Sequence, residues 1–252
     1  MLPAILNRVL AKAVSKLPPY LRLRATTMLW QWNPKRPPEL FRIDDYLPRH
    51  RRRVALDIGA NDGMTSLLLS RRFSKVHSFE PNAILAESWR SAVPSNVQQH
   101  CIALSNKSSE ACLHVPVVKG REYHGWASLG TPGVDQPFQA IDVPVQCVAL
   151  DTLNLGEDID FVKIDVEGHE IEVLEGSKNT LSRCRPWIVI ETSLKTSARV
   201  NEILTSFGFE RFDLESALGI SIAQYDEIYR PVEYPSIRKA EFANPSCGRC
   251  RR

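Results

Sequence analysis

Short apolar runs alternate with amphipathic stretches along the middle of the chain, and this pattern predicts its secondary structure. Buried strands are mostly apolar or β-branched, whereas helices repeat apolar residues at a spacing of three or four. By these criteria the sequence predicts strands at Val54–Gly59, Lys75–Pro81, Val97–Ser105, Phe161–Val166 and Trp187–Thr192. It predicts helices at Met64–Phe73, Ala83–Val93 and Ser197–Phe209.

Alternation of strands and helices is typical of a parallel sheet with right-handed crossovers and helices on both faces. We therefore expect an α/β fold with a doubly wound, Rossmann-like sheet. More than fifty residues between the third strand and Phe161 interrupt the alternation. Two stretches there, Ala111–Val118 and Ala140–Leu150, look like antiparallel strands. Because long connections usually carry structure or function, we expect residues from about 106 to 150 to form a β insertion over the active-site edge.

The first fifty residues form a basic extension that stands apart from this pattern. Within residues 2–17, six apolar residues share one helical face and three basic residues lie elsewhere. Such a helix packs on its own domain, rests on an anionic membrane or binds a partner, and the pattern leaves these interpretations open. Pro18–Pro19 ends the helix, and Asn33–Pro38 is predicted as a linker.

Composition places the chain among ordinary globular proteins, with 252 residues of which 43% are hydrophobic and 24% charged. No run approaches the roughly 18 apolar residues that cross a bilayer, and no secretory signal pattern is visible. Six scattered cysteines indicate reduced thiols. We therefore expect a cytoplasmic protein, and contact of residues 2–17 with the inner membrane surface stays one of the open interpretations. In the tail, 236–252, one CxxC supplies only two of the four ligands of a structural zinc, and none is assigned.

The net charge of +3 conceals an asymmetry along the chain. Residues 1–53 hold twelve Lys/Arg and three Asp/Glu, a net charge of +9, so the remaining chain carries −6. The acidic part contains neither a basic-aromatic cluster nor a nucleic-acid-binding motif. Nucleic acid is therefore not an expected partner, and no oligomeric state is assigned.

The most specific chemical signal is the glycine-rich stretch Leu56–Gly63 after the first strand. Gly59 allows a sharp turn and close approach of a ligand, and the helix that follows presents free N–H groups to the same crevice. Asp57 could accept a hydrogen bond from a cationic amine. Glu80 ends the second strand, where doubly wound folds hydrogen-bond ribose hydroxyls. A tight turn without a ligand is the alternative interpretation.

Several motifs in order carry a resemblance to a known family. The stretches LDIGANDGMTSLLL, FEPNAILAESW, CIALSN, FVKIDVEGHEIEVLEG and WIVIET together resemble the FkbM family of S-adenosylmethionine-dependent methyltransferases, from about Val54 to Phe209. The resemblance implies a class I methyltransferase domain, here set at residues 51–235, and O-methylation of hydroxyls on sugars, glycans or glycosylated natural products. S-adenosylmethionine is the cofactor that it implies.

By position, the resemblance also implies which residues contact the cofactor. Five residues of the first turn would surround its methionine part: Asp57, Gly59, Ala60, Asn61 and Gly63. Glu80 would hold the ribose, with Pro81 and Asn82 shaping the turn beside it. Ala103 and Leu104 would lie near the adenine.

The acidic stretch after the fourth predicted strand supplies the candidate catalytic groups. Asp165 and Glu167 can both point into the crevice, where Asp165 orients or deprotonates a substrate hydroxyl or, alternatively, only caps the next helix. His169 is the second candidate base because its pKa suits proton uptake near neutrality. Glu191 should lie on the same rim. These four side chains could hold a divalent metal, but their spacing does not require one, and none is assigned. Three further acids are predicted as solvated helix charges: Glu170, Glu172 and Glu175.

Four residues of the insertion are candidates to cover a sugar, because aromatic faces suit sugar rings and polar groups hydrogen-bond them: Tyr123, His124, Trp126 and Ser128. A core role is the alternative for Trp126. Two other functions stay open at this point. One is a metal-dependent sugar-nucleotide transferase or hydrolase that uses Asp165 and Glu167, and the other is a non-catalytic binding module.

Overall fold

The computed structural model describes residues 13–14, 16–30, 37–130, 139–222 and 225–233. Within these residues a seven-stranded sheet has the order β10-β11-β9-β8-β1-β2-β3. Its strands are β1 (Val54–Ile58), β2 (Lys75–Phe79), β3 (Val97–His100), β8 (Ile159–Ile164), β9 (Trp187–Glu191), β10 (Phe209–Arg211) and β11 (Asp226–Pro231). The first five run parallel to their neighbours among themselves, whereas β11 is antiparallel to β9 and β10.

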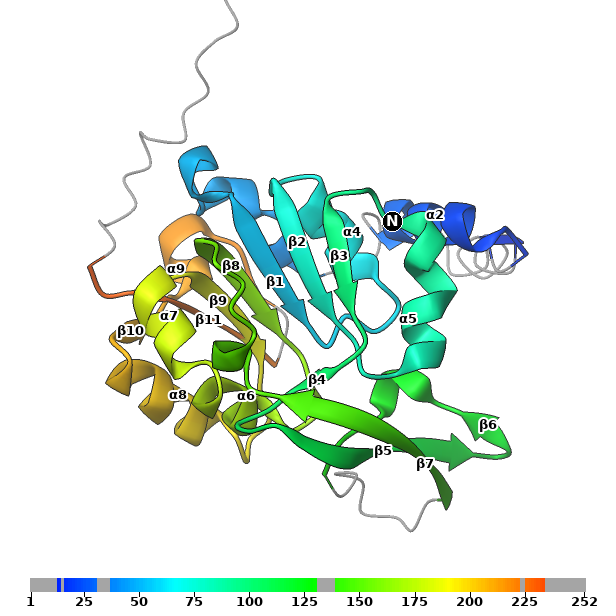
Figure 1. The fold of residues 1–252 in the computed structure, drawn as a ribbon. Coiled ribbons are helices and arrows are strands. Elements are labelled where there is room, and N and C mark those ends of the chain that lie inside the picture. The colour runs from blue at the N-terminus through cyan, green and yellow to red at the C-terminus, as the bar shows by residue number, and fades with distance from the viewer. Residues whose placement is uncertain (1–12, 15, 31–36, 131–138, 223–224, 234–252) are drawn as a thin grey trace, which may run out of the picture.

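Helices cover both faces of this sheet, which confirms the predicted doubly wound α/β class (Figure 1). The helices of the sheet region are α4 (Met64–Ser70), α5 (Ala83–Trp89), α6 (Glu170–Glu175), α7 (Lys178–Cys184), α8 (Ser197–Ser206) and α9 (Leu214–Leu218). Apolar residues of α6, α7 and α8 pack with Leu56 and Ile58 on one face. Residues of α4 and α9 pack with Ala55 on the other. Every residue of β1 and β8 is buried, as expected for central strands covered on both sides.

The third predicted strand, Val97–Ser105, is wrong as a single element. The chain leaves the sheet after β3, at Cys101, and Ala103–Leu104 forms β4, which pairs with β7 in a second sheet. The parallel ladder with β2 ends at His100, so the apolar run beyond it turns away to join the insertion.

The second sheet has the order β4-β7-β5-β6. Its long strands, β5 (Ser109–Val118) and β7 (Gln139–Val148), pair antiparallel. β6 (Arg121–Glu122) and the short helix η4 (His124–Trp126) extend it, and η5 (Leu150–Thr152) leads back toward β8. Figure 1 shows this sheet across the ends to which the arrows of β1, β2 and β8 point. It therefore lies over the carboxyl edge of the main sheet.

Part of the predicted N-terminal extension belongs to the core of the domain. α2 (Pro19–Trp30) contacts α4 and α5, and α3 (Pro38–Phe41) is followed by the short helices η1 (Ile43–Asp45) and η2 (Arg49–Arg51). Four side chains from this segment pack into the core against the sheet: Leu40, Ile43, Tyr46 and Leu47. Pro38 begins α3, so the predicted linker is helical at its last residue.

Some sequence predictions lie outside the described residues. These are most of the helix at 2–17, most of the linker at 33–38 and the tail from 236 onward with its CxxC pair. Where the chain is described, no helix is both long and apolar enough to span a membrane. The four cysteines there form no disulfide: Cys101, Cys112, Cys147 and Cys184.

Candidate active site

The glycine-rich turn after β1 is shaped by contacts with the turn that follows β8. Gly59 has φ +84°, and the backbone N–H groups of Gly59 and Ala60 both donate to the Phe79 carbonyl, at 2.9 and 3.0 Å. A Cβ at Gly59 would lie only 1.8 Å from the Asp165 carbonyl oxygen. The absence of a side chain therefore lets two turns of the protein meet, in addition to the sharp bend that the sequence predicts.

Gly63 and Ala60 lie behind this turn and do not line the cavity beside it. Gly63 has φ +79°, and a Cβ there would lie 2.4 Å from the Trp89 ring. The Trp89 indole N–H donates to the Asn61 carbonyl at 2.8 Å, and Ala60 packs in the same apolar cluster. The structure thus assigns both residues to supporting the turn, whereas the sequence suggested direct contacts to a cofactor.

Asp57 also faces away from the cavity. Its side chain is only 1% exposed and accepts a hydrogen bond from Ser66 of α4, whose hydroxyl lies 2.6 Å from that of Ser78. Burial raises the pKa of Asp57 to about 7. Because α4 covers this carboxyl, we place Asp57 in the support of the turn and not in the expected contact with an amine.

Glu80 occupies the position that the sequence predicts for a ribose ligand. Its Oε2 accepts from the Asn61 N–H and its Oε1 from the Asn82 N–H, both at 2.8 Å. Burial raises its pKa to about 7. A carboxylate has about four lone pairs, so each oxygen keeps acceptor capacity for a ligand hydroxyl. Asn82 caps α5 through the Ile84 and Leu85 N–H groups and does not line the cavity.

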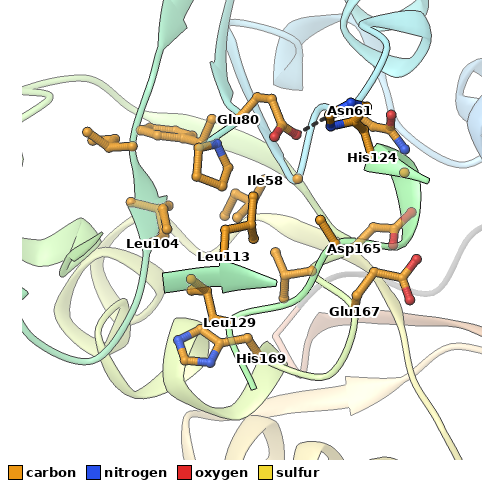
Figure 2. A pocket seen from close by; sticks show the side chains of 18 of the residues that line it. Ile58, Asn61, Glu80, Leu104, Leu113, His124, Leu129, Asp165, Glu167 and His169 are labelled. Carbon is orange, nitrogen blue, oxygen red and sulfur yellow. Dashed lines mark hydrogen bonds between the residues drawn. The ribbon is translucent and has the colours of Figure 1, made fainter. Parts of the chain in front are cut away.

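A cavity that is partly open to solvent lies between the two turns and the insertion (Figure 2). Its polar lining consists of Asn61, Glu80, His124, Asp165, Glu167, His169 and Glu191. Its apolar lining includes Ile58, Phe79, Pro81, Ile102, Ala103, Leu104, Leu113, Leu129 and Val166. Four carboxyl groups therefore face one cavity whose opposite wall is largely apolar.

A buried lysine holds the acids at the end of β8. The Lys163 ammonium lies 3.1 Å from Asp226 Oδ1 and 3.7 Å from Asp165 Oδ2. Burial alone would lower the pKa of Lys163, but the charges of Asp165 and Asp226 raise it above its ordinary value. Lys163 is therefore a permanent cation beneath Asp165.

The two glutamates beside Asp165 have raised pKa values. Burial, then the charge and hydrogen bond of Asp165, raises the pKa of Glu191 to about 8. Partial desolvation, then the charge of Asp165, raises the pKa of Glu167 to about 7. Glu167 also has φ +51°, a strained backbone for a residue with a side chain. In Figure 2 Asp165 and Glu167 lie on the same side of the cavity as Asn61.

Both ring nitrogens of His169 have partners. Nε2 lies 3.0 Å from the Ser105 hydroxyl, and Nδ1 lies 3.5 Å from Glu172 Oε2. Burial lowers its pKa, although Glu172 acts in the opposite direction, so the ring is neutral at pH 7.

The prediction that Glu170 is a solvated helix charge is wrong. Its side chain turns back and accepts from the Gly168 N–H at 2.8 Å, and only 3% of the residue is exposed.

Of the four residues predicted to cover a sugar, only His124 lines the cavity. Its Nδ1 lies 2.9 Å from Asn82 Nδ2 and its Nε2 lies 2.9 Å from Glu122. Tyr123 and Trp126 stack with ring centres 4.9 Å apart outside the lining, and Trp126 is 58% exposed. Ser128 is buried, and its hydroxyl donates to the Gly130 carbonyl.

A family match decides what kind of site this is. Residues 57–211 match the model of the Methyltransferase FkbM domain family, which is more than half of the chain. The chain belongs to the FkbM methyltransferase family. The resemblance expected from the motifs is thus confirmed, and with it membership of a group of S-adenosylmethionine-dependent methyltransferases with a class I α/β fold. No curated protein matches the sequence.

Solved methyltransferases resemble the FkbM chain at low identity. The FkbM methyltransferase of Methylobacillus flagellatus KT is 14% identical with a TM-score of 0.47, over 89% of this chain and 58% of that one. A TehB-like SAM-dependent methyltransferase of Corynebacterium glutamicum is 12% identical, TM-score 0.43, over 77% and 86%. Magnesium protoporphyrin IX methyltransferase of Synechocystis, solved with bound SAM, is 13% identical, TM-score 0.42, over 83% and 80%. The chain thus spans 58% of the length of the first of these.

The FkbM site contains functional candidates that sequence reasoning missed. Lys163 lies in the stretch FVKIDVEGHEIEVLEG, where the sequence predicts only a buried strand. Its partner, Asp226, lies 63 residues further along the chain. Gly125 packs against Asn61, since a Cβ there would lie 2.9 Å from Asn61 Nδ2. A lysine inside an otherwise apolar buried strand is the signal that could have pointed to a buried ion pair.

Proposed function

We propose that the protein is an S-adenosylmethionine-dependent O-methyltransferase that acts on a hydroxyl of a sugar, a glycan or a glycosylated natural product. The observation that carries the proposal is the cavity itself. It brings together Glu80, which keeps acceptor capacity for ribose hydroxyls, and a second carboxylate, Asp165, that a buried lysine holds in place. Family membership supplies the reaction class.

The cavity suits the cofactor both in the polar and apolar groups that line it and in its charge. Glu80 keeps free lone pairs for the ribose hydroxyls, and Phe79, Ile102 and Leu104 offer an apolar wall for the adenine. The cofactor carries a sulfonium and an ammonium group against one carboxylate, so its net charge complements the unpaired acids of the cavity. When bound, S-adenosylmethionine supplies an electrophilic methyl group. The protein has to bind, orient and exclude water.

Asp165 is the group best suited to accept the proton of the acceptor hydroxyl. It faces the cavity, and Lys163 and the protonated Glu191 keep its carboxylate in place. His169 is less suited because both of its ring nitrogens are already engaged. The hydroxyl oxygen would bond to the methyl carbon while the bond between that carbon and the cofactor sulfur breaks, so that S-adenosylhomocysteine leaves. The proton of the hydroxyl would move to Asp165 and then to solvent.

The insertion supports a sugar as the acceptor. Tyr123 and Trp126 form an exposed aromatic stack near the cavity, and His124 reaches into its lining from the same segment. Aromatic faces pack well against the C–H groups of sugar rings, and polar atoms beside them can bond the hydroxyls. The stack would hold the sugar while its reacting hydroxyl enters beside Asp165.

The experiment combines cofactor binding with turnover. Formation of S-adenosylhomocysteine is measured with free sugars, nucleotide sugars and glycosylated natural products as acceptors. Asp165→Asn should lower kcat by about 10² or more while cofactor affinity changes by less than about threefold. His169→Gln should keep kcat within about tenfold of the wild type.

Two results would contradict the assignment. Unchanged kcat in Asp165→Asn would remove it as the base. Full activity on a small molecule without any sugar, with none on the sugar-bearing acceptors, would remove the acceptor class. Calorimetry with S-adenosylmethionine on each variant separates a lost base from a lost cofactor site.

A further inference from the structure

A second hollow lies at the edge of the sheet opposite the active site. It is lined by Phe41, Asp44, Arg49, Arg52, Leu68, Arg71, Arg72 and Ser74, which we call the arginine cleft. Arg49 and Arg52 precede the start of β1, and Arg71 and Arg72 precede the start of β2. The cleft thus collects four guanidinium groups and a single carboxylate at the amino-terminal edge of the parallel strands.

Two of these arginines are fixed by the fold. Arg52 donates to the Leu47 carbonyl at 2.9 Å and pairs with Asp44. Arg72 donates to the Phe41 and Leu68 carbonyls at 3.0 and 3.2 Å and lies 3.2 Å from the same Asp44 carboxylate. Their side chains are only 9% and 18% exposed. Asp44 is therefore committed to these two cations.

The other two arginines of the cleft have no such role. Within the described part of the chain, the side chains of Arg49 and Arg71 are exposed and make no ion pair or hydrogen bond. Two other arginines of the run that contains Arg49 do have an acid partner: Arg51 and Arg53 both pair with Asp160, at 3.7 and 2.7 Å. The fold thus neutralises most of the basic run and leaves Arg49 open, next to Arg71 from a different segment.

We propose that the arginine cleft binds a phosphate group with two or more negative charges, a phosphomonoester or a diphosphate. Arg49 and Arg71 would close on the phosphate oxygens above the fixed Arg52 and Arg72, because planar guanidinium groups match phosphate geometry with paired N–H donors. The Ser74 hydroxyl, which lines the same cleft, is a further donor. With four guanidinium groups and one carboxylate, the cleft keeps an excess of positive charge that can balance the negative charge of such a ligand.

This site is independent of methyl transfer. The cofactor cavity is acidic and lies at the carboxyl edge, so a phosphate ligand would be repelled there and attracted here. A ligand in the arginine cleft leaves the cavity open at the other end of the strands. A soluble diphosphate and the headgroup of a phosphomonoester lipid present the same chemistry to the cleft, and the experiment distinguishes them.

The test uses the full chain at low salt. Inorganic pyrophosphate is titrated by calorimetry, and vesicles of phosphatidylcholine with and without phosphatidic acid are used in co-sedimentation. The variant is Arg49→Gln with Arg71→Gln. The control is Lys107→Gln with Arg121→Gln, which removes the same charge from exposed positions outside the cleft. S-adenosylmethionine affinity is measured with and without pyrophosphate.

We expect the cleft variant to lose at least about tenfold in affinity for pyrophosphate or for phosphatidic acid vesicles, and the control to lose less than about twofold. Binding of pyrophosphate identifies a soluble ligand, and binding of vesicles alone identifies a lipid headgroup. The proposal is overturned if the wild type binds neither probe, or if both variants weaken equally. It is also overturned if pyrophosphate competes with S-adenosylmethionine, because the phosphate would then occupy the cofactor cavity.

Discussion

The two edges of the main sheet carry charges of opposite sign, and they differ in how those charges are paired. At the carboxyl edge, four acids line one cavity above the buried cation Lys163, and the pKa values of Glu80, Glu167 and Glu191 are raised. At the amino edge, Asp44 pairs with Arg52 and Arg72, and Asp160 pairs with Arg51 and Arg53, whereas Arg49 and Arg71 of the arginine cleft have no acid partner among the described residues. Each edge thus has one hollow in which charges of a single sign predominate. This difference supports the two proposals made above, a cationic cofactor at one end of the strands and a phosphate at the other.

The largest effect is expected from a substitution that separates the two turns at the carboxyl edge. Gly59→Ala would place a Cβ 1.8 Å from the Asp165 carbonyl at φ +84°. We expect a loss of about 3 kcal/mol or more in the free energy of unfolding, measured by denaturant titration. Gly219→Ala is the matched control, because its φ is +68° but nothing lies near its Cβ. It should cost about 1 kcal/mol. Equal losses would show that backbone strain alone, and not the contact between the turns, demands glycine at 59.

Removing the cation beneath the acids should change the pH profile of the enzyme. Lys163 lowers the pKa of Glu167 and Glu191, so Lys163→Met should raise both. Because the protonated form of Glu191 holds Asp165, the basic limb of kcat should move to higher pH. We expect kcat at pH 7 to fall by about tenfold or more, with partial recovery in Lys163→Arg, which keeps the charge. A profile that falls in height without moving along the pH axis would assign Lys163 a structural role only.

A smaller effect follows from the raised pKa values of the cavity acids. A carboxyl whose pKa is higher folded than unfolded stabilises the fold below its unfolded pKa and loses that contribution as pH rises through the folded pKa. For Glu80, at about 7, and Glu191, at about 8, this window runs from about 4.5 upward. We expect Tm without ligand to fall from pH 5 to 8, and S-adenosylmethionine affinity to rise over pH 6 to 8. A Tm that rises from pH 5 to 8, or an affinity that falls from pH 6 to 8, would show that these acids are not the partners of the cationic ligand.

The smallest effect separates the two kinds of arginine at the amino edge. Arg49→Gln and Arg71→Gln should each change the free energy of unfolding by less than about 0.5 kcal/mol. Arg52→Gln should cost about 1 kcal/mol or more, because the Leu47 carbonyl and Asp44 lose a well-buried donor. Urea unfolding measures each variant. If Arg49→Gln were as costly as Arg52→Gln, the free arginines of the cleft would have a structural role.

The sequence predicts the central strands well because they are continuous apolar runs between turn residues. β11, Asp226–Pro231, was missed because its mixed charges resemble a surface segment, and only its partners β9 and β10 show that it is a strand. The break in the third strand was missed for a similar reason. The apolar run through Ala103 continues, but its pairing partner changes from β2 to β7.

Residues that line the cavity were predictable where they end or directly follow a strand, as Glu80 and Asp165 do. Asp57 was misplaced because β1 is buried on both faces, so alternation gives no sign of which side chains face a ligand. Lys163 could be located in its strand, but its pairing with Asp226 depends on a contact 63 residues away along the chain. Local motifs thus locate the edge of the sheet, whereas long-range pairing decides which side chains act there.

Calorimetric titration with S-adenosylmethionine and S-adenosylhomocysteine tests the central claim most directly. The wild type is compared with Glu80→Gln and with Glu87→Gln, which neutralises an exposed acid on the neighbouring α5. We predict micromolar binding in the wild type and in Glu87→Gln, and a loss of at least about tenfold in Glu80→Gln, with circular dichroism confirming that all three are folded. No binding by the folded wild type, or equal affinity in all three proteins, would contradict the assignment of this acidic cavity as the cofactor site.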